Sequence, residues 1–168
     1  MSKTLNPSMN PNLPRLKSVR ALPGRKLKLV WQSGETRLCG LTGLIARVPA
    51  LTPLADATIF AGVKMIDWGA GVGWPNGLDL SAQTLHQISG EQQNFGSQAF
   101  RKWQTELNLS NQEAADALGL ALGTIKNYRK GNVIPLAIAV ACRAMLNDPH
   151  VIAAHYRPRK PGRPYAEA

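Results

Sequence analysis

The sequence predicts an α+β protein in which a small mixed domain is followed by an all-helical one. Alternating apolar and polar residues, which are typical of strands, occur between residues 16 and 74. Beyond residue 96 the apolar residues recur at helical spacing instead. The polar stretch 90–96 is flanked by glycines, as linkers often are. The expected parts are an α+β domain over 13–89, a linker over 90–96, a helical domain over 97–156 and a basic flexible tail over 157–168.

The first domain opens with a predicted β-hairpin. Residues 16–20 and 27–31 alternate apolar with polar, and Leu22-Pro23-Gly24-Arg25 between them has the composition of a turn. Ser33 and Gly34 lead into a third strand at 36–39. A short apolar helix is expected at 41–48, because Pro49 disfavours its continuation.

The rest of this domain is predicted to contain strand, turn and helix. Residues 59–68 return to a strand-like composition. The glycines at alternate positions from 69 to 73 predict a tight turn before a short strand at 72–74. Asp79-Leu80-Ser81 predicts the N-terminal cap of a helix that runs to about Ser89.

The second domain is predicted to be a succession of helices. Phe100, Trp103 and Leu107 share one face of the first. Ser110 caps the second, and Glu113 three residues later completes a capping box. Gly119 is predicted to end the second helix and Gly131 the third. Pro135 is predicted to begin a long apolar helix at 136–146, and Pro149 to begin a last short helix.

Basic residues outnumber acidic ones, with 20 Lys and Arg against 10 Asp and Glu and a formal net charge of +10. The bases gather before Glu35 and between Arg101 and Arg163, whereas the middle of the chain is slightly acidic. This charge favours a polyanionic partner such as nucleic acid. Solvated side chains that only maintain solubility account for much of it as well.

The remaining composition gives no sign of export or of a structural metal. Cys39 and Cys142 lie far apart in unlike segments, without the spacing of a disulfide framework or a zinc site. The N-terminal stretch is polar and proline-rich, unlike a signal peptide, and no apolar run reaches the ~18–20 residues of a membrane span. We expect a soluble cytoplasmic protein with reduced thiols and no membrane partner.

The stretch from Asn111 to Gly131 resembles the helix-turn-helix of phage repressors, of the lambda-repressor type. Ala115 falls where two helices cross closely, and Gly119 falls where the turn needs a positive φ. The resemblance covers about fifty residues, from Gly96 to Asp148. It implies an inward-facing set that holds the second helix of the motif: Ala114, Leu118, Leu120, Ile125 and Tyr128, completed by Phe100, Trp103, Leu107, Leu136 and Val140.

The same resemblance implies a DNA-binding regulator whose partner is double-stranded DNA. In that family the second helix enters the major groove and the preceding helix touches phosphate. Carried over by position, the phosphate contacts are Asn111, Lys126, Arg129 and Lys130, and the base-facing residues are Leu122, Gly123, Thr124 and Asn127. Leu122 and Gly123 offer no side-chain hydrogen bond to a base edge, so specific readout would depend on Thr124 and Asn127. Such regulators are commonly homodimers, and the apolar helix at 136–146 could cover the first domain or contact a second subunit.

The basic tail resembles an AT-hook in its Gly162-Arg163-Pro164 core, although Pro161 stands where a second arginine is expected. The alternative is a disordered segment that adds non-specific affinity for phosphate. Under either interpretation the candidate DNA contacts of the tail are Arg157, Arg159, Lys160 and Arg163.

Residues 15–88, and above all Trp74-Pro75-Asn76-Gly77-Leu78-Asp79, resemble a small bacterial domain family of unknown function. Members of that family are suspected toxin–antitoxin components, which implies a small protein partner. One interpretation makes Trp68, Trp74 and Asp79, with nearby Asp67, a recognition surface. The other explains the tryptophan as a strand end and Asp79 as a helix cap.

No enzyme, cofactor or metal is expected. The three histidines, His86, His150 and His155, lack metal-ligand spacing, and no nucleophile elbow or P-loop is present. Asp67, Asp79 and Glu91 are the acids that a nuclease-like metal site would use. The alternative to a DNA-binding regulator is a protein-interaction module, such as an antitoxin-like partner, in which the helical domain is a scaffold.

Overall fold

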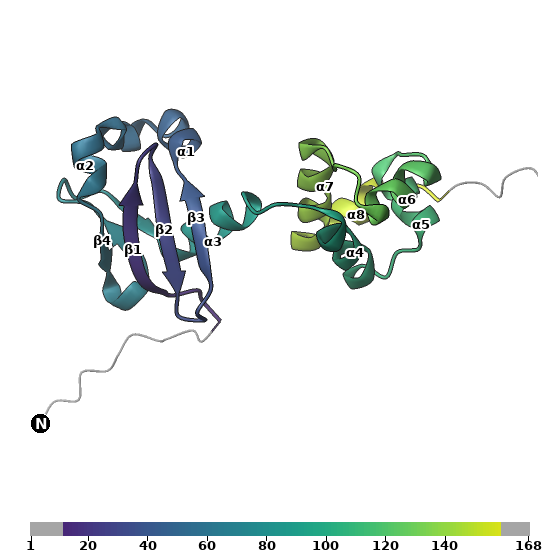
Figure 1. Cartoon of the computed structure of the whole chain (residues 1–168), viewed down its shortest axis with the longest axis horizontal. Helices are drawn as coiled ribbons and strands as arrows, with labels where there is room; N and C mark the ends of the chain where they lie inside the picture. The colour runs from purple at the N-terminus through teal and green to yellow at the C-terminus, as the bar shows by residue number, and fades with distance from the viewer. Residues whose placement is uncertain (1–11, 159–168) are drawn as a thin grey trace, which may run out of the picture. The chain divides into compact units, whose positions relative to one another are not determined.

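A computed structural model describes residues 12–158 and confirms the α+β class (Figure 1). The described chain divides into two compact units, 12–93 and 94–158, which we call unit 1 and unit 2. Unit 1 contains both sheets, and unit 2 is helical throughout. Each unit has a hydrophobic core of its own.

Unit 1 begins with the antiparallel sheet β1-β2-β3, which we call sheet A. Its strands are β1 (Leu16–Leu22), β2 (Lys26–Trp31) and β3 (Thr36–Gly40), so the predicted hairpin and third strand are confirmed. Leu27 pairs with Cys39 across β2 and β3, and Leu27, Leu29 and Cys39 are completely buried. One face of sheet A therefore forms part of the core, and the other is open.

Three short helices follow sheet A: α1 (Thr42–Arg47), the 3-10 helix η1 (Pro49–Ala55) and α2 (Ala57–Ala61). The strand expected from residue 59 is wrong for its first part, because α2 occupies these residues. The Asp56 carboxylate starts α2 by accepting hydrogen bonds from the backbone N–H groups of Thr58 and Ile59, at 2.8 and 3.0 Å. Phe60 is then buried in the core at 2 % exposure.

A second antiparallel sheet, β4-β5-β6, follows with strands β4 (Lys64–Ile66), β5 (Gly71–Gly73) and β6 (Asp79–Ser81). The predicted glycine turn is wrong, since Gly71 and Gly73 lie in the central strand. A Cβ at Gly71 would lie 2.7 Å from the Leu80 carbonyl oxygen, so close strand packing explains this glycine. The tight turn is instead the 3-10 helix η2 (Asp67–Gly69), between β4 and β5.

The helix α3 (Ala82–Glu91) closes unit 1. The predicted capping segment is confirmed at Ser81, whose Oγ accepts from the Thr84 N–H at 3.1 Å. The interpretation of Asp79 itself as the cap is wrong. Asp79 is the first residue of β6, paired with Gly73. Gly90 and Glu91, expected in the linker, belong to α3.

His86 of α3 and Gln92, directly after its end, hold this helix against sheet A. The His86 ring meets the Trp31 ring edge to face at 5.0 Å between centroids. The Gln92 amide makes two hydrogen bonds of 2.8 Å with the backbone N–H and carbonyl of Gly40. Burial raises the pKa of the Cys39 thiol, beneath this helix, to about 11, as in an unreactive core thiol.

Unit 2 consists of α4 (Ser97–Glu106), α5 (Asn111–Leu118), α6 (Leu122–Lys130), α7 (Leu136–Asn147) and α8 (Pro149–His155). Phe100 and Trp103 are completely buried at its centre, as predicted. In the described part of the chain no single helix is long and apolar enough to span a membrane, and α7 and α8 reach that length only together, with a bend of 117° between them.

The prediction that Leu136 and Val140 complete the core of unit 2 is wrong. They are 74 and 49 % exposed, and Val133 just before α7 is 90 % exposed. The helix instead turns Ala139, Cys142 and Met145 inward. The outward apolar residues Val133, Leu136 and Val140, which we call the α7 face, therefore lie on the surface.

Candidate nucleic-acid interface

The amino end of α5 is fixed by the predicted capping box. The Ser110 hydroxyl accepts from the Glu113 N–H at 3.2 Å, and the Glu113 carboxylate accepts from the Ser110 N–H at 2.8 Å. These hydrogen bonds stabilise the carboxylate and hold the pKa of Glu113 below its usual range. These hydrogen bonds fix Asn111 as the first residue of α5.

A tight left-handed turn connects α5 to α6. Gly119 has φ 66° and ψ 33°, the conformation that favours glycine. The Leu120 N–H donates to the Ala115 carbonyl at 2.9 Å and closes the turn. Ala115 is completely buried, and so is Ile125 on the facing side of α6. The small side chain at 115 allows the two helices to approach closely.

The outward side of α6 carries four exposed residues at helical spacing, Gly123, Lys126, Asn127 and Lys130. We call them the α6 stripe. The helix has three basic residues and no acidic one. Its opposite side, with Ile125 and Tyr128, is buried. A positively charged helical ridge is thus presented on a rigid support.

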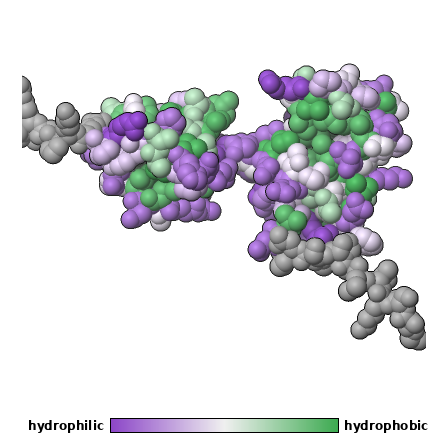
Figure 2. Space-filling model, turned by 180° about the vertical axis from the view of Figure 1, so that it is seen from behind, coloured by the Kyte–Doolittle hydropathy of each residue, from purple (hydrophilic) through white to green (hydrophobic). Residues whose placement is uncertain are grey.

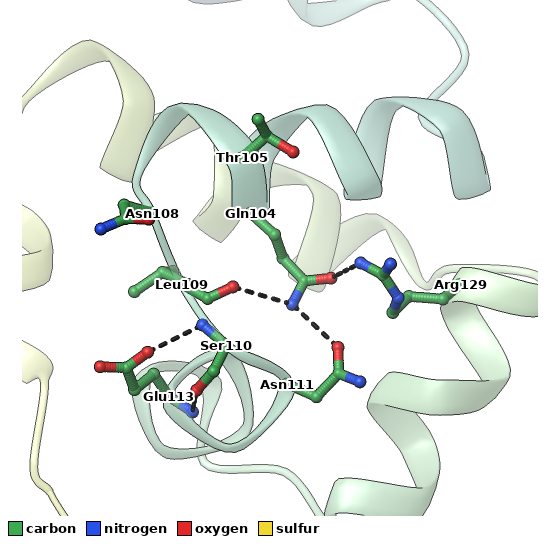
Figure 3. A pocket seen from close by; sticks show the side chains of 8 residues that line it. All are labelled: Gln104, Thr105, Asn108, Leu109, Ser110, Asn111, Glu113 and Arg129. Atoms are coloured by element: carbon green, nitrogen blue, oxygen red, sulfur yellow. Dashed lines mark hydrogen bonds between the residues drawn. The ribbon is translucent and has the colours of Figure 1, made fainter.

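A buried glutamine connects α4, α5 and α6 (Figure 3). The Gln104 amide N–H donates to the Asn111 side-chain oxygen at 3.2 Å and to the Leu109 carbonyl at 3.4 Å. Its oxygen accepts from the Arg129 guanidinium at 2.7 Å. Gln104 is only 3 % exposed, so these hydrogen bonds are partly shielded from water. They orient two of the predicted phosphate-contact residues, Asn111 and Arg129.

The carboxyl end of α6 is held by Arg101 from α4. Both Nε, at 3.0 Å, and Nη2 of Arg101 donate to the Arg129 carbonyl oxygen. A guanidinium at this position satisfies a free carbonyl and complements the negative end of the helix dipole. Gly131, with φ 119°, then ends the helix as predicted.

An open polar hollow of about 690 Å³ lies where α4, α5 and α6 meet (Figure 3). Its walls are side chains and backbone with hydrogen-bonding groups, including Gln104, Ser110, Asn111 and Arg129. No group of three or more His, Cys, Asp or Glu that suits a metal lies in the described residues. Asp67, Asp79 and Glu91 are thus not brought together into such a group.

The predicted contact residues fall into two sets. Gly123, Lys126, Asn127 and Lys130 form the exposed stripe, whereas Asn111, Leu122, Thr124 and Arg129 are half-buried beside it. Arg157 lines a second hollow, of about 500 Å³, beside the turn at Gly119 and Leu120. The other tail candidates, Arg159, Lys160 and Arg163, lie outside the described residues.

The predicted recognition surface of unit 1 is not formed as a set. Trp74 is buried at 5 % exposure, and its indole N–H donates to the Phe60 carbonyl at 3.0 Å. Trp68 is 80 % exposed, and Asp79 is exposed on β6. Trp74 therefore has a structural role, and Trp68 is the tryptophan available on the surface.

Gln104 and Arg101 were missed by the sequence prediction. Gln104 follows Phe100 by four residues and precedes Leu107 by three, so it lies on the apolar face of α4. A polar residue on such a face signals a buried hydrogen-bonding role. Nothing in the sequence indicates its partners, because Asn111 and Arg129 come close only in the folded unit.

One protein family matches part of the chain, within unit 1. Residues 16–89 match the family described as "Protein of unknown function (DUF2442)". This agrees with the resemblance of the segment to a family of unknown function, and it supplies no activity. None of the curated proteins matches the chain.

A solved structure from Nitrosomonas europaea ATCC 19718 is also similar to the chain. That protein is named "Putative DNA Binding Protein". It is 28 % identical, with a TM-score of 0.45 over 80 % of this chain and 87 % of that chain.

Proposed function

We propose that this chain is a DNA-binding regulator that uses α5, the Gly119 turn and α6 as a helix-turn-helix of the phage-repressor type. The α6 stripe would enter the major groove of a duplex, with the start of α5 against the phosphates. The single observation that carries the proposal is this stripe: exposed Lys126, Asn127 and Lys130 on a helix whose other side is locked into the core. The proposal includes no catalytic activity and no cofactor.

Two features support phosphate contact by the helix pair. Asn111 and Arg129 are held by Gln104 before any ligand arrives, which lowers the entropy lost on binding. Lys126 and Lys130 stand one helical turn apart on the same side. Lysine and arginine that neutralise phosphates supply most of the sequence-independent affinity for DNA.

Base readout would be limited to few side chains. Asn127 can pair with adenine and Thr124 can accept or donate a hydrogen bond at a base edge. Leu122 can contact a thymine methyl group, and Gly123 offers only its backbone. We therefore expect modest discrimination between sequences and a large contribution from phosphate contacts.

The test is the salt dependence of duplex binding by the full chain. Lys126→Ala and Lys130→Ala are each expected to weaken binding to every sequence and to reduce the slope of log K against log salt by about 1. Lys102→Ala is the matched control, because Lys102 is exposed on α4 and paired with Glu106 at 3.6 Å. The proposal fails if the folded chain binds no duplex at low salt, or if all three variants behave alike.

A homodimer is part of the proposal, with the α7 face as the contact. This face begins two residues after Gly131, where α6 ends, and two-fold dimers that place a recognition helix in each half-site are common among helix-turn-helix proteins. Leu136→Lys is expected to change the oligomeric state measured by sedimentation from dimer to monomer, since it buries a charge in an apolar contact. The matched control is Met65→Lys, at an exposed apolar residue of unit 1. A wild-type chain that stays monomeric at every accessible concentration contradicts the dimer.

The basic tail is assigned to the same duplex. Arg157, the last basic residue that the structure describes, lies beside the turn that precedes α6. A chain leaving unit 2 at this point starts close to the proposed groove contact. Arg159, Lys160 and Arg163 would then add contacts to phosphate or to the minor groove.

The second candidate is a protein-interaction module, such as an antitoxin-like component, in a cytoplasmic complex with a small protein. The observation that favours it is exposed apolar surface on unit 1, where Met65 and Trp68 are 41 and 80 % exposed. Figure 2 shows a broad green, hydrophobic patch on the side of unit 1 that faces away from the viewer of Figure 1. A folded chain that lacks duplex binding but binds a protein through Trp68 would favour this candidate.

A further inference from the structure

The open face of sheet A gathers positive charge from two strands. Arg20 on β1 lies directly opposite Lys28 on β2. Lys26 precedes Lys28 by two residues on β2, so its side chain lies on the same face. All three side chains are exposed. Figure 1 shows β1, β2 and β3 in front of unit 1, with no helix drawn over this face. The open face is thus a basic surface that other elements of unit 1 leave uncovered.

No acid of the described residues neutralises these three side chains, because none of them takes part in an ion pair. Glu35, between β2 and β3 in the chain, is already held by the Arg37 guanidinium at 2.6 and 2.9 Å. Like charges directly across a strand pair destabilise a sheet. The Arg20–Lys28 pair therefore costs stability unless an anion lies between or above the two groups.

The spacing of these cations suits a phosphate chain. Lys26 and Lys28 are two residues apart on one strand, which separates them by about 7 Å. Arg20 lies on the neighbouring strand, about 5 Å away from the line of β2. Each strand of a duplex carries a charge about every 3.4 Å along its axis, so phosphates are available to all three groups.

The chemistry of the face indicates backbone contact rather than base stacking. Its other side chains are Ser18, Leu22, Val30, Thr36 and Leu38, and none of them is aromatic. Sheets that bind unpaired bases use exposed aromatic rings for stacking. Here the recognisable ligand group is the phosphate alone.

We infer that the open face of sheet A binds the phosphate backbone of double-stranded DNA through Arg20, Lys26 and Lys28. The inference rests on the proposed function of unit 2 only for the choice of the duplex as the ligand. Unit 1 then has a role of its own, because it binds DNA phosphates independently of sequence while α6 contacts the bases. A chain with two such surfaces holds the duplex at more phosphates than unit 2 alone.

The test is a titration of the full chain with a short duplex, followed by amide resonances in two-dimensional NMR spectra. Backbone signals of β1 and β2 around Arg20 and Lys28 are expected to shift. In the double variant Arg20→Ser with Lys28→Ser these shifts are expected to disappear. The slope of log K against log salt should fall by about 2, and binding at 0.1 M salt should weaken about tenfold or more.

The matched control is Arg47→Ser with Lys64→Ser, which removes two charges from α1 and β4 instead. Shifts in α6 without shifts in sheet A, or equal loss of affinity in both double variants, overturn the inference and leave the proposed function standing. Shifts in sheet A without shifts in α6 support the inference and overturn the proposed function. No shift in either unit overturns both.

Discussion

Replacing Gly69 by alanine is expected to destabilise unit 1 by more than about 3 kcal/mol, through backbone strain and steric overlap. Gly69 has φ 87°, and a Cβ built there would lie 2.1 Å from the Leu16 carbonyl oxygen. That oxygen belongs to the backbone at the start of β1, so no side-chain rotation can relieve the overlap. The two residues before it, Asp67 and Trp68, also have positive φ, at 48 and 51°. The whole turn would have to move away from sheet A.

Gly77→Ala is the matched control for this prediction. Gly77 has a similar φ of 84°, but a Cβ there meets nothing within 4 Å. Its substitution should cost only the left-handed strain, about 1–2 kcal/mol. Urea unfolding by tryptophan fluorescence measures both variants. In a Trp103→Phe background the three remaining tryptophans, Trp31, Trp68 and Trp74, all report on unit 1. Equal losses in the two variants would contradict the close backbone contact.

Gln104→Leu is expected to destabilise unit 2 by about 1–3 kcal/mol, because it leaves polar partners without hydrogen bonds. Leucine has a similar volume, so the substitution mainly removes hydrogen bonds. The Asn111 side chain and the Leu109 carbonyl each lose a donor, and the Arg129 guanidinium loses its acceptor at 2.7 Å. Gln104→Glu retains an acceptor for Arg129 and should recover part of the loss. Hydrogen exchange of the Ile125 and Tyr128 amides measures the change in unit 2 alone.

Gln104 is a positioning residue in the proposed function, so a second readout is needed. We expect Gln104→Leu to weaken duplex binding at temperatures where unit 2 remains folded, since Asn111 and Arg129 lose their fixed orientation. Thr105→Ala, at the exposed neighbouring position, is the control and should change neither stability nor binding appreciably. Unchanged duplex affinity in a folded Gln104→Leu chain would restrict Gln104 to a purely structural role.

Local chemistry made several elements predictable from the sequence. The capping box at Ser110 and Glu113 and the left-handed Gly119 depend on residues within one helical turn of each other. The hairpin of sheet A depends on a short turn between two alternating strands. In each case the residues that decide the conformation are neighbours in the chain.

The errors occurred where tertiary packing decides. From their composition, residues 59–61 are expected to begin a strand, but the Asp56 cap and the burial of Phe60 against Trp74 favour a helix. Leu136 and Val140 fit an apolar helical face as well as Ala139 and Cys142 do, so periodicity alone does not choose which face of α7 turns inward. The connection through Gln104 joins three helices, and no local pattern encodes it.

The central claim, that α6 lies on DNA, is tested most directly by DNA cleavage from a tethered iron chelate. The chelate is attached through Asn127→Cys on the α6 stripe, or through Lys102→Cys on α4 as the control. Burial raises the pKa of the native thiols Cys39 and Cys142 to about 11 and about 12, so they should not react with the reagent. We predict strand cleavage from the Asn127→Cys conjugate and little from the Lys102→Cys conjugate. An uncut duplex in a bound Asn127→Cys complex, or equal cleavage from both positions, would contradict the account.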